Sequence, residues 1–487
     1  MKKVILGAAA LIFAAGMYGQ ANPAPPQAPA QALGLTSSSP DPNANMGESV
    51  QNGNANKVLI QQAGTNQMVY TKQDDGTGTG GNRAWIAQTG QVSGASGVEN
   101  AAEVHQSGSL NQSKTLQEGD YNEALTRQGQ NNLASSENKA FIHQGTGQQA
   151  QDNKAGVDQD GIKNQARTLQ TYDNSVAWTK QVGDENTSDI KQNAGPNQTD
   201  GHKAEVDQTG DDNASWINQY GAGATNEAVT FQLGTENNAI QVQQNTAGSG
   251  GSVNNAMISQ GDFFTGNFFP SIWSDLVALD GSIDDGSYNG ASHAATAFQF
   301  QQGTDNLADI RQFSDAPAGG NYAEQNQIGD SNKSFMVQNL YGTSTGGDNY
   351  GRQDQTGDNN IAGLSQAGLN HKAYQRQYGD GNEALSTQRG NGNLLNTYQG
   401  GNDNYVESLQ HGTANQALLV QKGGHSFSLK QNEGDFTGGG NFANVLQLGP
   451  DGDFIDDAEN CIFPNQETVP TFTDISTYTI DAPCPGC

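Results

Sequence analysis

A short motif recurs about thirty times along the chain and constrains its architecture more than any other feature. Each copy has an Asn, a small residue two positions later, an aliphatic residue or Thr two positions after that, and a Gln two further on, as in the run from Asn122 to Gln128. In one long stretch the Gln recurs every eleven residues, from Gln355 to Gln421. Because two is the side-chain period of a β-strand, each copy is predicted to form one short strand.

Each repeat divides into this seven-residue strand and a linker of usually four residues. The positions that point the same way as the Asn and Gln keep a narrow chemistry, whereas the alternate positions carry Lys, Glu, Asp, Trp, Tyr or Leu. The restricted face is therefore predicted to point inward. The linkers contain Gly next to Asp or Asn, which is typical of tight turns. We expect an all-β fold, a β-solenoid with two short strands per coil of about 22 residues, stacked parallel and in register as in amyloid.

The inward Asn and Gln need hydrogen-bond partners, because a buried amide without one is costly. In-register stacking places each Gln over the Gln of the next coil, so that the side-chain amides can form a ladder along the axis. The residues predicted for this inward ladder are Asn122, Gln128, Asn186, Gln192, Asn213, Gln219, Asn382, Gln388, Asn393, Gln399, Asn404, Gln410, Asn415 and Gln421.

Changes in composition divide the chain into six segments. These are a signal peptide at 1–19, a Pro- and Ala-rich leader at 20–55, a first repeat array at 56–260, an aromatic-rich insert at 261–301, a second array at 302–447 and a Cys-containing tail at 448–487. The first segment joins two Lys residues to a short apolar run and small residues, which predicts export. The aromatic insert is interpreted either as a binding patch or as a loop that folds against the flank of the solenoid.

Acidic residues recur in the linkers, one position after Gly. A calcium ladder would use such carboxylates, but each linker offers only one or two of them and the period is eleven rather than nine. We interpret them instead as gatekeepers, whose stacked like charges slow aggregation during export. The predicted gatekeepers are Asp120, Asp184, Asp211, Asp330, Asp358 and Asp380.

Few side chains carry reactive chemistry. The three cysteines, Cys461, Cys484 and Cys487, all lie in the tail, where a disulfide between two of them is expected in preference to a redox site. The seven His residues fall in no catalytic or metal-binding motif, and two of them, His202 and His371, replace the inward Asn. We therefore expect neither enzymatic activity nor a cofactor.

The chain is strongly acidic, with a formal net charge of −29 at pH 7. This charge argues against nucleic acid as a partner, because binding phosphates requires clustered Lys and Arg. The apolar run of the signal peptide is too short to cross a bilayer, and no later stretch is more apolar, so membrane insertion is not expected. Hydrophobic residues make up only 33%, which suits an array whose units each bury a thin apolar strip.

Taken together, the copies resemble the curlin repeat, the building block of curli fibres in bacterial biofilms. The run from Gln117 to Gln128 fits the N-x-A-x3-Q strand and the Q-x-G-x-x-N linker of that family, and the resemblance covers roughly residues 56–447. It implies secretion through an outer-membrane pore and assembly outside the cell into amyloid fibres by strand addition at the ends of the solenoid. This chain differs from the family in four features: it has more than double the usual number of repeats, an Ala/Pro leader, an insert and a Cys-containing tail.

We therefore expect a secreted structural subunit that polymerises with itself at the cell surface. The sequence leaves open whether this chain forms the bulk of the fibre or acts as its nucleator. In the first case a separate nucleator subunit would be a partner. The alternative is a monomeric solenoid adhesin that binds a ligand through its variable outer face or its insert.

Overall fold

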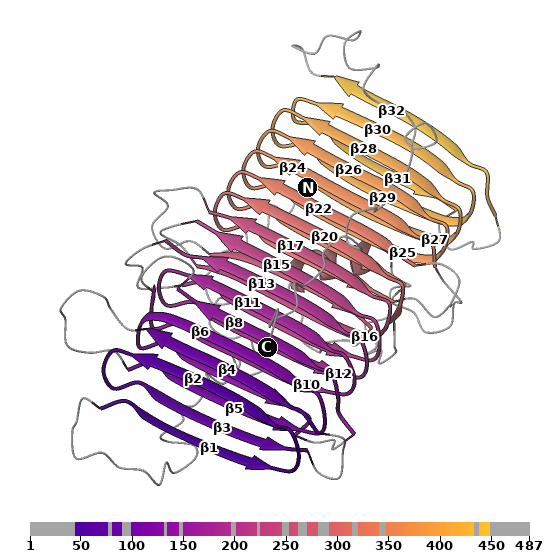
Figure 1. Cartoon of the computed structure of the whole chain (residues 1–487). Coiled ribbons are helices and arrows are strands. Elements are labelled where there is room, and N and C mark those ends of the chain that lie inside the picture. The colour runs from indigo at the N-terminus through magenta and orange to yellow at the C-terminus, as the bar shows by residue number, and fades with distance from the viewer. Residues whose placement is uncertain are drawn as a thin grey trace.

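The repeated seven-residue runs form strands that stack into two long parallel β-sheets (Figure 1). The computed structural model describes residues 44–75, 80–89, 99–130, 134–145, 150–195, 201–221, 225–245, 253–261, 270–280, 292–313, 320–339, 347–432 and 438–448. Within this part of the chain, successive repeats alternate between the two sheets, so each coil contributes one strand to each sheet. The predicted β-solenoid with two strands per coil is confirmed.

Sheet A begins at β1 and ends at β31. Its strands, in stacking order, are β1 (Met46–Asn52), β3 (Met68–Asp74), β5 (Ala101–Ser107), β7 (Glu123–Gln128), β10 (Lys154–Asp160), β12 (Val176–Val182), β14 (Lys203–Thr209), β16 (Asn226–Thr235), β18 (Asn254–Gln260), β21 (Leu307–Gln312), β23 (Lys333–Gln338), β25 (Ile361–Leu369), β27 (Glu383–Asn391), β29 (Tyr405–Thr413) and β31 (Ser426–Gln431).

Sheet B runs beside it from β2 to β32. Its strands are β2 (Lys57–Ala63), β4 (Arg83–Thr89), β6 (Gln112–Asp120), β8 (Lys139–Gln144), β11 (Gln165–Thr171), β13 (Thr187–Asn193), β15 (Ala214–Tyr220), β17 (Asn238–Gln244), β20 (Thr296–Gln302), β22 (Tyr322–Ile328), β24 (Tyr350–Thr356), β26 (Lys372–Tyr378), β28 (Leu394–Gly400), β30 (Gln416–Lys422) and β32 (Phe442–Leu448). Two short strands, β9 (Ala150–Gln151) and β19 (Ser292–His293), pair in parallel with the C-terminal residues of β6 and β16.

Neighbouring strands pair in register by repeat position. Gln159 of β10 pairs with Gln181 of β12, which pairs in turn with Gln208 of β14. At the usual strand spacing of about 4.8 Å, the stack is about 70 Å long. Equivalent side chains of all coils are therefore aligned in columns along one axis.

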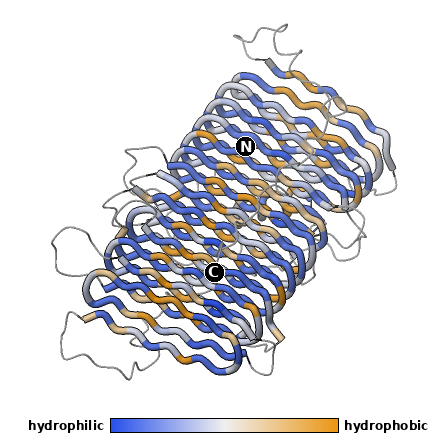
Figure 2. Tube along the Cα trace, in the orientation of Figure 1, coloured by the Kyte–Doolittle hydropathy of each residue, from blue (hydrophilic) through white to orange (hydrophobic). Residues whose placement is uncertain are grey.

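The core is a narrow apolar strip between the two sheets. Ala140 and Ile142 of β8 are fully buried and pack with Ala155 and Val157 of β10 from the opposite sheet. Burying one Ile or Val side chain contributes roughly 1.5–3 kcal/mol. In Figure 2 most of the trace is hydrophilic and the apolar positions form narrow stripes across the stack. The solenoid is thus held together by many thin layers.

The repeat extends past two of the predicted segment boundaries. Strand β1 lies in the predicted leader and pairs with β3, and β20 lies in the predicted insert and pairs with β17 and β22. The sequence pattern does not identify these two strands because a polar residue stands at the inward position that is usually aliphatic. This residue is Ser49 in β1 and Gln299 in β20. The predicted signal peptide and the three cysteines lie outside the described residues.

Part of the insert forms helix α2 (Pro270–Leu279), which packs on the outer side of sheet A. Ile272 and Leu276 share an apolar cluster with Leu385 of β27 and Leu409 of β29. The residue beneath them on β25 is Gly363, where a Cβ would lie only 2.8 Å from the Cγ2 of Ile272. The described part of the insert therefore folds against the flank of the solenoid, while Phe263, Phe264, Phe268, Phe269 and Tyr288 lie outside the described residues.

The linkers between strands form tight arcs that also stack on one another. Gly183 has a φ of 111°, and its N–H donates at 2.9 Å to the carbonyl oxygen of Asp160, the last residue of β10 in the preceding coil. A Cβ at this position would lie 2.2 Å from the carbonyl oxygen of Gly210 in the next arc. Gly is therefore required both for the backbone conformation and for the close approach of neighbouring arcs.

Gly183→Ala is expected to lower the unfolding free energy by about 3 kcal/mol, because strain at positive φ and the displaced neighbouring arc both contribute. Gly392 is the matched control, since its φ is 66° and a Cβ there has no heavy atom within 4 Å. Gly392→Ala should cost only about 1 kcal/mol. Thermal unfolding followed by circular dichroism compares the two variants, and equal losses would show that arc stacking contributes little.

Candidate functional site

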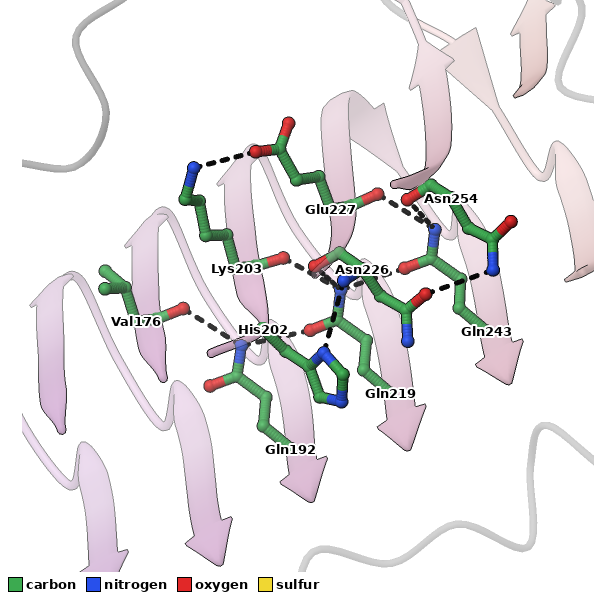
Figure 3. A network of polar contacts seen from close by, with 9 residues as sticks. All are labelled: Val176, Gln192, His202, Lys203, Gln219, Asn226, Glu227, Gln243 and Asn254. Atoms are coloured by element: carbon green, nitrogen blue, oxygen red, sulfur yellow. Dashed lines mark hydrogen bonds and ion pairs between the residues drawn. The ribbon is translucent and has the colours of Figure 1, made fainter. Parts of the chain in front are cut away.

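A column of glutamines runs along the inner side of each sheet. Gln192 donates its Nε2–H groups to Oε1 of Gln219 at 3.0 Å and to the backbone carbonyl oxygen of Val176 at 3.0 Å (Figure 3). In sheet A the column is unbroken from Gln51 to Gln431. In sheet B it is unbroken from Gln62 to Gln447. Every glutamine in both columns donates toward the C-terminal end of the stack.

A second set of columns is formed by the Asn that precedes each strand. The backbone N–H of Asn213 donates to Oδ1 of Asn186 at 3.1 Å, and Nδ2 of Asn213 donates to the carbonyl oxygen of Gly234 in an arc of the next coil at 2.9 Å. The asparagines thus connect strands to arcs as well as coil to coil. The Asn and Gln side chains predicted for the ladder lie in these columns, and none is more than 1% exposed.

Two histidines take the place of an Asn in these columns, as expected from their sequence positions. Nδ1 of His202 accepts the backbone N–H of Asn226 at 3.2 Å (Figure 3). Nε2 of His202 lies 3.2 Å from the carbonyl oxygen of Asn193. His371 bonds in the same way with Asn393 and Ala367. These contacts require a neutral ring with its proton on Nε2, and burial lowers the pKa of both histidines to about 4.

A third glutamine column was not predicted. It occupies the inward position that is usually aliphatic, and Gln241 donates to Gln299 at 3.0 Å at its start. The column continues through Gln325, Gln353 and Gln375, all of which are at most 1% exposed. Its signal in the sequence is a Gln two positions before the ladder Gln, as in Gln353 and Gln355. The interior of the middle coils is therefore more polar than the basic repeat suggests.

The predicted gatekeepers also bond from coil to coil. The backbone N–H of Asp330 donates to Oδ1 of Asp358 at 2.8 Å, and that of Asp358 donates to Oδ1 of Asp380 at 2.9 Å. Asn402 accepts the next bond in the column, so the bond itself does not require a charge. Asp184 and Asp211 form an equivalent pair in other arcs. The effect of these charges on aggregation stays a prediction.

Asp120 differs from the other predicted gatekeepers. It ends strand β6 and is 6% exposed, and its backbone pairs with Gln151 of the short strand β9. The charge of a buried carboxylate cannot repel an incoming chain in the way that an exposed one does. Its position in the sequence, one residue after Gly119, does not distinguish it from the exposed arc residues.

The two ends of the stack are built like its interior. Among the described residues, β1 and β2 pair on one side only, as do β31 and β32 at the other end. The inward side chains of Val58 and Ile60 at the N-terminal end and of Leu429 and Val445 at the C-terminal end are only partly buried. Each end thus presents a strand edge and an apolar strip with the spacing of the next coil.

The described residues give no sign of a metal centre or a membrane span. No group of three or more His, Cys, Asp or Glu side chains in the described ranges could hold a metal ion. Helix α2, the helix in these ranges, is too short to cross a bilayer. The pair of solenoid ends, with the glutamine columns that reach them, is the candidate site because each end presents an unpaired strand edge among the described residues.

No protein-family model matches the chain, and no curated protein is similar to it at a significant level.

Proposed function

We propose that this chain is a secreted structural subunit that polymerises end to end into extracellular curli-type amyloid fibres. The observation that carries the proposal is the continuity of the ladders up to the last coils at both ends. Most soluble repeat proteins cover such edges with a capping unit. An edge that keeps the interior register is a template for the strand of another chain.

The direction of the glutamine bonds favours head-to-tail addition. At the N-terminal end, Oε1 of Gln51 and Oε1 of Gln62 accept no N–H group from the described residues, because each glutamine donates toward the C-terminal end. At the other end, Gln431 and Gln447 have no glutamine ahead of them. Donors at one end thus match acceptors at the other. Addition of one copy to the next continues both columns without a change of register.

A seeded assembly time course on the mature chain tests the proposal. We expect a lag that preformed seeds abolish, and fibres whose diffraction shows a reflection at about 4.7–4.8 Å along the axis. A chain that is rich in β-structure but stays monomeric at high concentration would reject polymerisation. In that case the outer faces would remain as the functional surface, and the adhesin alternative would replace the proposal.

Val445→Lys is expected to slow fibre elongation by about tenfold or more. In the monomer the lysine can reach solvent from the partly buried position, but at a fibre junction it would be buried without a partner. Leu446→Lys is the matched control, because Leu446 is the next residue of β32 and its side chain points outward. Elongation rates from equal seed concentrations compare them, and equally fast growth of both variants would show that this end of the stack is not a junction.

A further inference from the structure

The outer face of sheet B carries one basic side chain on each of six successive strands. These residues, which we call the basic row, are Lys57, Arg83, Lys114, Lys139, Arg167 and Lys191 on β2, β4, β6, β8, β11 and β13. Stacking places one positive charge about every 4.8 Å along the rod, in a band that is three outward positions wide. Lys57, Arg83 and Lys139 share the first outward position of the strand, Lys114 and Arg167 the second, and Lys191 occupies the third. The whole chain has only 22 Lys and Arg residues and a net charge of −29, so such a row is not expected from composition.

Most of the basic row is not neutralised by its own face. Arg167 donates from Nε to Oδ1 of Asp189 at 3.0 Å, and Lys191 lies 3.5 Å from the same carboxylate. Lys57, Arg83, Lys114 and Lys139 form no ion pair with a carboxylate among the described residues. Lys114 lies instead with its Nζ 4.0 Å from the ring centroid of Trp85. An aromatic contact holds the cation in place without cancelling its charge.

The opposite face of the same coils has the opposite charge. On β1 to β16 of sheet A, nine carboxylates and five Lys or Arg side chains lie on the outward side of the strands. Glu103 is only 3% exposed, and burial raises the pKa of Glu123, Asp158 and Glu205, so the negative charge of this face comes mainly from the other five. The carboxylates are those of Glu48, Asp74, Glu103, Glu123, Asp158, Asp160, Glu205, Asp207 and Glu227, and the cations are those of Lys72, Arg127, Lys154, Lys180 and Lys203. On the matching strands of sheet B, β2 to β17, Glu118 and Asp189 are the outward carboxylates against the six cations.

We propose that solenoids associate side by side, with the basic row of one copy against the acidic face of sheet A of a second copy. The partner is a second copy because both faces repeat at the same strand spacing, so opposite charges meet along the whole row without accumulating a mismatch. A contact between two different faces does not close on itself, and further copies can be added laterally. This contact uses the sides of the rod and does not depend on the end-to-end junction of the proposed function.

The test compares two variants of equal net charge. In K57Q/R83Q/K114Q/K139Q the basic row loses its unpaired cations, whereas K72Q/K154Q/K180Q/K203Q removes four cations from sheet A and leaves the basic row intact. Assembly width is measured by electron microscopy and small-angle scattering at about 20 mM and about 500 mM NaCl, where the Debye length falls from about 20 Å to about 4 Å. Circular dichroism confirms that both variants keep the fold.

At low salt, wild type and the sheet A variant are expected to form wide bundles that separate into single rods of unchanged length at high salt. The basic-row variant is expected to stay as single rods at both salt concentrations, with about a tenfold smaller bundled fraction at low salt. Equal bundling of both variants, or bundle width that does not respond to salt, would overturn the proposal.

If no fibres form, sedimentation velocity on wild type and the same two variants detects side-by-side pairs of single solenoids. A failure of end-to-end growth is thereby distinguished from a failure of side-by-side association. A polyuronate is added as a competing polyanion. Wild type that binds the polyuronate through the basic row but does not bundle at low salt would assign the row to an acidic polysaccharide and reject self-association.

Discussion

Gln192→Glu is expected to lower the local unfolding free energy by about 3–5 kcal/mol, the cost of a buried charge that lacks a partner. The glutamate has no Nε2–H group, so the oxygens of Gln219 and Val176 that accept hydrogen bonds from Gln192 would instead face a carboxylate. Gln192 is 1% exposed, so water cannot compensate for the loss. Because Gln192 lies between Gln170 and Gln219 in the column, the damage should extend to the strands on both sides.

The matched control is Gln165→Glu on the outer side of β11. The chemical change is identical, but this side chain is partly exposed and takes no part in the ladder, so the effect should stay within about 0.5 kcal/mol. Hydrogen exchange of the amides of β11, β13 and β15 measures both variants at neutral pH. Similar protection in the two variants would mean that the column aligns the coils without contributing to their stability.

The coils that contain His202 and His371 are expected to lose stability as the pH falls from about 6.5 to about 4. The unfolded chain takes up a proton near the ordinary pKa of histidine, whereas burial holds the pKa of both folded residues at about 4. The folded state therefore binds fewer protons in this range, and the stability present above pH 6.5 is lost at the lower pH. A shift of this size corresponds to about 3 kcal/mol for each histidine.

The measurement is the difference between wild type and H202N/H371N, in which the asparagine of the repeat is restored. This difference is needed because other groups titrate in the same range. Burial raises the pKa of Glu205 to about 7, with Asp207 adding to the shift, and this residue makes the fold more stable as the pH falls toward 4.5. Hydrogen exchange near β14 and β26 should show the loss in wild type alone. An equal pH dependence of hydrogen exchange in wild type and H202N/H371N would contradict a destabilising role for the two histidines at low pH.

The period of the repeat was enough to predict the solenoid, because strand length, arc length and inward chemistry all follow from the same spacing. Gln192 could be placed in a ladder from its position alone. Helix α2 could not be predicted in this way, since its apolar residues are buried against β27 and β29, which lie more than a hundred residues further along the chain. Strands β1 and β20 could not be predicted because they lack the inward aliphatic residue of the motif. They are recognised only by their in-register pairing with β3 and β22.

The basic row shows a different limit of the sequence pattern. In the sequence, Lys114 and Lys139 look like ordinary outward residues, because outward Lys, Arg, Asp and Glu are mixed along the repeats. Their grouping emerges only when every other repeat is assigned to the same sheet. Charge on a face is thus a property of the coil and not of the single repeat.

The common direction of the glutamine bonds gives the molecule an electrical axis. In both columns the amide oxygens point toward the N-terminal end and the N–H groups toward the C-terminal end, so the side-chain dipoles of the glutamines add along the stack as peptide dipoles do along a helix. The asparagines offset part of this sum, because Oδ1 of Asn186 accepts from Asn213 in the following coil and so points toward the C-terminal end. The third glutamine column, from Gln241 to Gln375, adds to the sum. A filament of such units would be a permanent dipole over its whole length, and it would align in an applied field with one end leading.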